Sequence, residues 1–96
     1  MAVTAYDRVA EKTRAMEASI YGALDSLDAY REEMEAIIAE QEASDEPNQM
    51  LIKRLRQFVG GAETMTKTIE DDVLSVLMFN LDRLFSVKSA EEGTFI

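Results

Sequence analysis

The chain has 96 residues, no cysteine, no histidine and a net charge of −9. Without these two residue types it lacks disulfides, thiol nucleophiles, the usual zinc ligands and the common general base. The negative charge disfavours nucleic-acid backbones and anionic membranes, which both attract Lys and Arg. We therefore expect neither an enzyme nor a nucleic-acid-binding or membrane-binding protein, and we expect no cofactor or metal.

Targeting signals are not evident at the start of the chain. Residues 1–12 alternate charged with small residues and lack the apolar centre of a cleavable secretory signal. The most apolar stretch, 73–87, contains Asp82 and Arg83 and is too short and too charged to cross a bilayer. We expect one cytoplasmic domain over 1–96, with packaging in a virion or export without a cleaved signal as alternatives.

The first half of the chain predicts one long helix. Its apolar residues recur at alternating steps of three and four, which is typical of a coiled coil. The stripe consists of Tyr6, Val9, Thr13, Met16, Ile20, Ala23, Leu27, Tyr30, Met34 and Ile37. It passes through Gly22 without a change of phase, so we predict a helix over about 4–43, with Thr4 as its N-cap.

A polar turn over 44–48 (Ser-Asp-Glu-Pro-Asn) is predicted to end this helix. Pro47 cannot continue a helix but suits the first turn of the next one. Asp45 or Glu46 would place negative charge near the N-terminus of that second helix, where the helix dipole favours it.

The second half predicts a helix of similar length, over about 47–88. Its stripe, again with steps of three and four, consists of Leu51, Leu55, Phe58, Ala62, Met65 and Ile69. Two adjacent glycines cost about 2 kcal/mol of helix stability relative to alanine, so a kink or break at Gly60-Gly61 is an alternative to a continuous helix. Two matched helices joined by a short turn predict an all-α fold, a long antiparallel helical hairpin that resembles a coiled coil.

Beyond Ile69 the apolar residues cover nearly the whole circumference of the second helix. One antiparallel partner covers one side only, so we predict a protein–protein interface, with self-association into a helical bundle as the favoured outcome. A compact fold of three or four helices within one chain is the alternative. The tail, 89–96, is expected to fold back onto this apolar end or to insert into a neighbour. The predicted interface residues are Val73, Leu74, Val76, Leu77, Met78, Phe79, Leu81, Leu84, Phe85, Phe95 and Ile96.

Negative charge gathers on the first helix near the turn. Between Asp25 and Glu46 there are nine acidic residues and one basic residue, Arg31. Such a surface serves solubility, or it docks a basic partner. The predicted acidic patch consists of Asp28, Glu32, Glu33, Glu35, Glu40, Glu42, Asp45 and Glu46.

Taken together, these features predict a non-enzymatic structural or adaptor protein that self-associates through its apolar C-terminal helical half. Two alternatives come from other classes of protein. One is a small acidic inhibitor that mimics a nucleic acid and binds a basic protein as a decoy. The other is a chaperone that holds a client helix against 73–87. Hairpins of this size also occur among phage and secretion-system accessory proteins, which is an analogy of architecture only.

Overall fold

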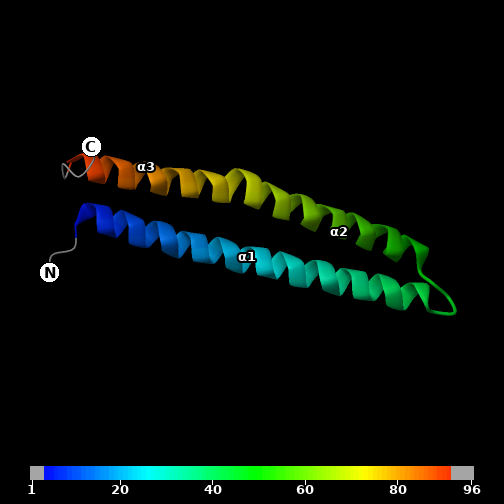
Figure 1. Ribbon diagram of the computed structural model, residues 1–96. Helices are drawn as coiled ribbons and strands as arrows, with labels where there is room; N and C mark the ends of the chain where they lie inside the picture. The colour runs from blue at the N-terminus through cyan, green and yellow to red at the C-terminus, as the bar shows by residue number, and fades with distance from the viewer. Residues whose placement is uncertain (1–3, 92–96) are drawn as a thin grey trace.

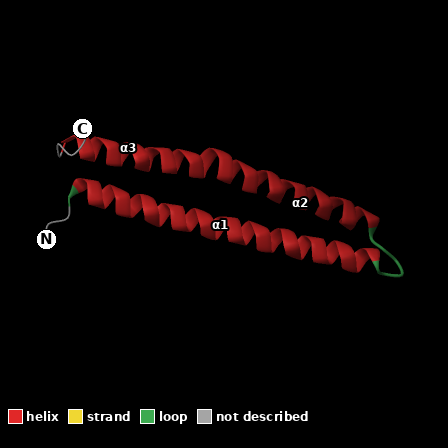
Figure 2. Cartoon of the chain, in the orientation of Figure 1, coloured by secondary structure: helices red, strands yellow, loops and turns green. Residues whose placement is uncertain are grey.

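The computed structural model describes residues 4–91 as two long helical arms that run antiparallel and are joined by one turn (Figure 1). The first arm is α1 (Ala5–Glu42), and the second consists of α2 (Gln49–Thr68), the π-helical segment η1 (Ile69–Leu74) and α3 (Ser75–Glu91). The molecule measures 72 × 25 × 15 Å. The described residues contain no strand (Figure 2). The predicted all-α antiparallel hairpin is thus confirmed.

A capping box fixes the start of α1, with Thr4 as the N-cap that the sequence predicted. The Asp7 backbone N–H donates to Thr4 Oγ1 at 3.1 Å, and the Thr4 N–H donates to Asp7 Oδ2 at 3.3 Å. Hydrogen bonds from the Thr4 side chain and then from its backbone lower the pKa of Asp7, with a smaller contribution from the charge of Lys88. Because the folded pKa is depressed, this contribution to stability is present at neutral pH and is lost as the pH falls through the lowered value.

The turn is tied to both arms by side-chain hydrogen bonds. The Asn48 N–H donates to Gln41 Oε1 at 3.2 Å, and Asn48 Oδ1 accepts from the Leu51 N–H at 3.1 Å. Asn48 is therefore the N-cap of α2, and Pro47 lies before the helix instead of in its first turn. The difference from the prediction follows from capping chemistry, because an asparagine side chain satisfies a free backbone N–H and sets the start of the helix.

The two arms meet along a seam, the line of buried and half-buried residues that face the opposite arm. On α1 the seam consists of Tyr6, Ala10, Thr13, Glu17, Ile20, Leu24, Leu27, Arg31, Met34, Ile38 and Gln41. From Tyr6 to Met34, every second residue of this series belongs to the predicted stripe. The other predicted members, except Ile37, which is half-buried, are exposed: Val9, Met16, Ala23 and Tyr30.

The reason for the difference is that α1 carries two overlapping stripes that share every seventh residue. The stripe that forms the seam contains Glu17 and Arg31, whose charges conceal it in the sequence. Long charged side chains can lay their aliphatic stems along apolar surface and keep the charged end in water. Both residues are half-buried, as are the apolar Leu24, which lies between them along the seam, and Ile38, which follows Arg31.

The second arm shows the same shift of one position. Its seam in α2 and at the first residue of η1 consists of Ile52, Leu55, Val59, Ala62, Thr66 and Ile69. Ile52 and Ala62 are the most buried side chains, at 2% and 1% exposure. The predicted stripe shares Leu55, Ala62 and Ile69 with this seam, whereas Leu51, Phe58 and Met65 lie on its flank and are exposed.

The irregularity in the second arm lies at η1 and not at the glycine pair. Helix α2 continues unbroken through Gly60 and Gly61. From Ile69 the next seam residue is Leu74, five positions later, where a regular helix would have placed Val73. The π turn accommodates this extra residue, and the Ser75 hydroxyl donates to the Glu70 carbonyl, five residues back, at 3.4 Å. The seam then continues with Leu77, Leu81, Leu84 and Lys88.

We predict that deletion of Asp72, within η1, leaves the hairpin intact. The deletion removes the one extra residue. Leu74 of the unaltered chain then follows Ile69 by four positions instead of five, so the π turn becomes an α turn. Helix content by circular dichroism should be unchanged, and the melting temperature should be equal or higher. Deletion of Thr64 in the regular α2 is the control, because it moves every later seam residue off the seam. Equal damage from both deletions would contradict this account of η1.

We also predict that Gly60→Ala and Gly61→Ala each raise the free energy of unfolding by about 1 kcal/mol. A methyl group at either position would have no neighbouring atom within 4 Å. Unfolding in urea measures the effect, and Ala62→Gly, at a buried seam position, is the destabilising control. A loss of stability in the alanine variants would show that the glycines are needed for a close backbone contact.

Candidate interaction surfaces

The two sides of the hairpin differ in chemistry, and contacts between the arms identify the first of them. An ion pair joins Arg56 to Glu42, and the Arg14 guanidinium lies 5.7 Å from the centre of the Phe85 ring. Each of these four residues directly follows a seam residue. Residues in this position on both arms therefore meet on one side of the hairpin, which we call the charged side. It is lined near the turn by Asp28, Glu35, Glu42, Arg56, Glu63 and Glu70.

The opposite side is apolar. Where two seam residues lie four positions apart, it carries the residue that directly precedes the second of them, at intervals of seven on α1 and α2. Because residues that follow the seam meet on the charged side, residues that precede it lie together on the other edge. We call this surface the apolar strip, and its apolar members are Val9, Met16, Ala23, Tyr30, Ile37, Leu51, Phe58, Met65, Val73 and Val87. The polar Asn80, which precedes the seam residue Leu81, interrupts the series on α3.

Most of the apolar strip is open to solvent. Met16 is 57% exposed, Phe58 44% and Met65 50%. Only Ile37 is half-buried by its neighbours. The sequence analysis assigned most of the α1 and α2 members to the contact between the arms, so this surface was not anticipated. The signal that could have revealed it is the presence of apolar residues at three positions of each heptad instead of two.

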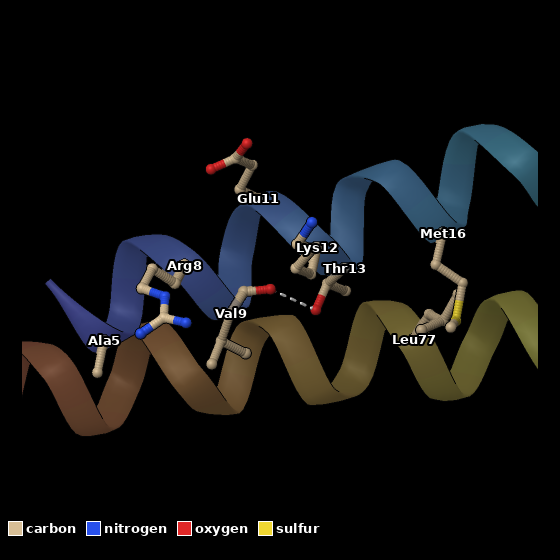
Figure 3. Close-up of a pocket in the computed structure, with 8 residues that line it drawn as sticks. All are labelled: Ala5, Arg8, Val9, Glu11, Lys12, Thr13, Met16 and Leu77. Atoms are coloured by element: carbon tan, nitrogen blue, oxygen red, sulfur yellow. Dashed lines mark hydrogen bonds between the residues drawn. The ribbon is translucent and has the colours of Figure 1, made fainter. Parts of the chain in front are cut away.

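A shallow groove lies at the end of the apolar strip that is farthest from the turn (Figure 3). Val9 and Met16 point toward the second arm, and Met16 ends beside Leu77, whereas Glu11 points away. The Thr13 hydroxyl donates to the Val9 carbonyl at 2.8 Å, so this polar group is satisfied within the helix. The complete lining is Ala5, Arg8, Val9, Glu11, Lys12, Thr13, Met16 and Leu77. Such a groove can accept an apolar side chain, and its lining carries the positive charges of Arg8 and Lys12 and the negative charge of Glu11.

The predicted interface residues divide into two groups. Leu74 and Leu81 are buried and Leu77 and Leu84 are half-buried, because they form the seam with α1. The exposed members are Val73, Val76, Met78, Phe79 and Phe85. Phe95 and Ile96, and with them the predicted fold-back of the tail, lie outside the described residues. The interface itself stays a prediction, but its seam leucines already have a partner within the chain.

The eight residues of the predicted acidic patch are all exposed, on the turn half of α1 and on the turn. Arg31 pairs with Asp28 at 3.7 Å and with Glu35 at 3.3 Å, and Arg56 pairs with Glu42. Among residues 4–91 these are the ion pairs that involve the patch. Most of its negative charge therefore faces solvent.

Two other kinds of feature are absent from the described part of the chain. Its acidic residues form no group of three that could hold a metal ion. None of its helices combines the length and the apolar character that crossing a bilayer requires. No family model, curated protein or solved structure matches the chain. Function is therefore inferred from the apolar strip, the exposed face of α3 and the acidic patch.

We predict that replacing Glu32, Asp45 and Glu46 together by lysine leaves helix content and self-association unchanged. None of the three side chains forms an ion pair, and exposed charges contribute little to stability. If the acidic patch docks a basic partner, the triple variant should lose that binding. The binding should also weaken steeply with salt, which screens exposed charges beyond about 8–10 Å. Binding that survives both the reversal and high salt would contradict a docking role for the patch.

Proposed function

We propose that this protein is a non-enzymatic structural or adaptor subunit that acts through protein–protein contacts and self-associates through exposed apolar surface, including that of α3. The observation that carries the proposal is the imbalance between core and surface. Among residues 4–89, six residues are buried and two of them are alanines, whereas fourteen large apolar side chains are exposed. A hairpin with so small a core is only marginally stable by itself.

The exposed apolar surface of α3 supports self-association in energetic terms. Burying a half-exposed large apolar side chain contributes about 1 kcal/mol, which is half of the value for full burial. Six such residues lie on or next to α3, so their burial contributes several kcal/mol, comparable to the total stability of a small domain. They are Val73, Val76, Met78, Phe79, Phe85 and Val87.

The acidic patch supports a second candidate function. A small acidic inhibitor would use the turn end of the hairpin, where eight acidic side chains are exposed, to bind a basic protein. A chaperone would instead expose α3 as a monomer and cover it with an apolar client helix. The oligomeric state of the pure protein separates these candidates from the proposal, because both alternatives predict a monomer in the absence of a partner.

We predict that the purified protein is an oligomer of defined mass at micromolar concentration. Light scattering measures the mass, and the melting temperature should rise with protein concentration because association stabilises the folded state by mass action. The double variant Val73→Asp/Val76→Asp should dissociate, since burying unpaired carboxylates is unfavourable. Glu32→Ala, at an exposed charged position, should leave the assembly intact. A monomer whose melting temperature is independent of concentration would refute the proposal.

Leu81→Asp is not a suitable test of the interface, although the sequence placed Leu81 there. This side chain is 8% exposed and belongs to the seam with α1. Its replacement would break the hairpin itself, so a loss of mass could not be assigned to the interface. Val73 and Val76 are exposed in the hairpin and avoid that difficulty.

A further inference from the structure

We infer that the apolar strip is covered by a second copy of this chain that lies antiparallel along it, so that two hairpins form a four-helix bundle with their turns at opposite ends. This inference rests on the proposed self-association and adds to it a face, an occupant and a direction. It also extends the interface beyond α3, to the turn half of both arms.

The heptad pattern of both arms indicates contact with two neighbours. A helix in a two-stranded coiled coil needs apolar residues at two positions of each heptad, whereas a helix in a bundle carries a third. Here the third position is apolar along α1, at Val9, Met16, Ala23, Tyr30 and Ile37, and along α2. The hairpin provides one neighbour for each arm, so the apolar strip calls for a second neighbour of the same length.

The size of the apolar strip fits a second copy. At 1.5 Å per residue the strip runs for about 42 Å on α1, from Val9 to Ile37, and about 54 Å on the second arm, from Leu51 to Val87. With a width of about 10 Å, one helix diameter, it covers about 500 Å². A stable protein dimer buries about 800 Å² on each partner, so the strip would form the apolar centre of such an interface and the polar residues beside it the rim. A short peptide would leave most of this length uncovered. A second hairpin covers it fully, and in a two-fold dimer each copy presents the same strip to the other.

The spacing of the strip on α1 favours the antiparallel direction. Ala23 lies midway between Val9 and Ile37, and also midway between Met16 and Tyr30. With a two-fold axis at Ala23, α1 of one chain packs on α1 of the second chain. The two Ala23 side chains, the smallest of the strip, then lie against each other. Tyr30 of each copy then lies level with Met16 of the other, at the groove of Figure 3. The bulky turn half of one strip is thus paired with the smaller far half of the other.

Charge favours the same direction. Residues 25–46 contain nine acidic residues and one basic residue, whereas 5–24 contain three of each sign. Turns at the same end would bring two strongly negative segments together, which like-charge repulsion opposes. The antiparallel arrangement places the acidic segment of each copy beside Arg8 and Lys12 of the other. With the axis at Ala23, Lys12 lies level with Met34 of the other copy, one residue from Glu33.

Spin labels test the direction in the otherwise unaltered protein. The chain has no cysteine, so Asp45→Cys places one label in the turn. Opposite turns predict a distance between the two labels close to the 72 Å length of the molecule, whereas adjacent turns predict a distance near its 25 Å width. A short distance would overturn the antiparallel arrangement. Oxidation provides an independent readout: Ala23→Cys should form disulfide-linked dimers, and a mixture of Val9→Cys and Ile37→Cys should form mixed dimers that neither variant forms alone.

A matched pair of methionines tests the face. Met65 lies on the apolar strip, and Met50 lies off it at 72% exposure. Met65→Asp should raise the dissociation constant by more than about 100-fold, because both copies bury the carboxylate, whereas Met50→Asp should change it by less than about twofold. The spin-label distance does not depend on how well the Met65→Asp variant folds.

The outcomes separate this inference from the function on which it rests. If Val76→Asp/Phe79→Asp, at two exposed α3 positions outside the strip, dissociates the assembly but Met65→Asp leaves it intact, self-association through α3 stands and the strip is refuted. If Met50→Asp and Met65→Asp weaken the assembly equally, the strip is again refuted. If the unaltered chain is a monomer, both proposals fail.

Discussion

The narrowness of the seam between the two arms determines most of the properties of this molecule. Two helices in contact can bury one edge of each other, and here that contact leaves six buried residues among those described. The two most buried, Ile52 and Ala62, lie on α2, and α1 contributes a single buried residue, Ala10. Because the seam uses so little of the apolar content of the chain, the remaining apolar side chains define the surface. The contrast between the charged side and the apolar strip follows directly from this limit.

The π turn shows how the second arm keeps a continuous seam in spite of its sequence. Two series of apolar residues follow Ile69, one with Val73 and Val76 and the other with Leu74 and Leu77. Only one of the two series can face α1. The extra residue in η1 selects the leucine phase and returns the valines to the surface. Val73 then directly precedes Leu74, as Phe58 precedes Val59 and Met65 precedes Thr66. One local change in helix geometry therefore keeps both the seam and the apolar strip in register along the whole arm.

The sequence was sufficient for the hairpin, its turn and the Thr4 cap, because each depends on local and periodic signals. It could not decide which of two overlapping stripes faces the other arm. Residues such as Leu27 and Ala62 belong to both stripes, and the choice depends on how Glu17, Arg31 and Thr66 are accommodated at a tertiary contact. The π turn was equally hidden, since Val73 and Leu74 are both apolar. The apolar strip was missed because its residues form the second of these overlapping stripes, which the sequence analysis assigned to the contact between the arms.

The contacts between the two arms differ in the number of residues that separate their partners along the chain, and this number grows with distance from the turn. The hydrogen bond from Asn48 to Gln41 spans seven residues and the Arg56–Glu42 ion pair spans 14. The 3.7 Å ion pair between Lys88 and Asp7, in contrast, encloses nearly the whole chain. Closing a longer loop loses more conformational entropy, so folding is favoured to start at the turn and to proceed outward like a zipper. The ends of the arms then form last and open first, which makes the groove beside Val9 and Met16 the part of the fold whose lifetime is shortest.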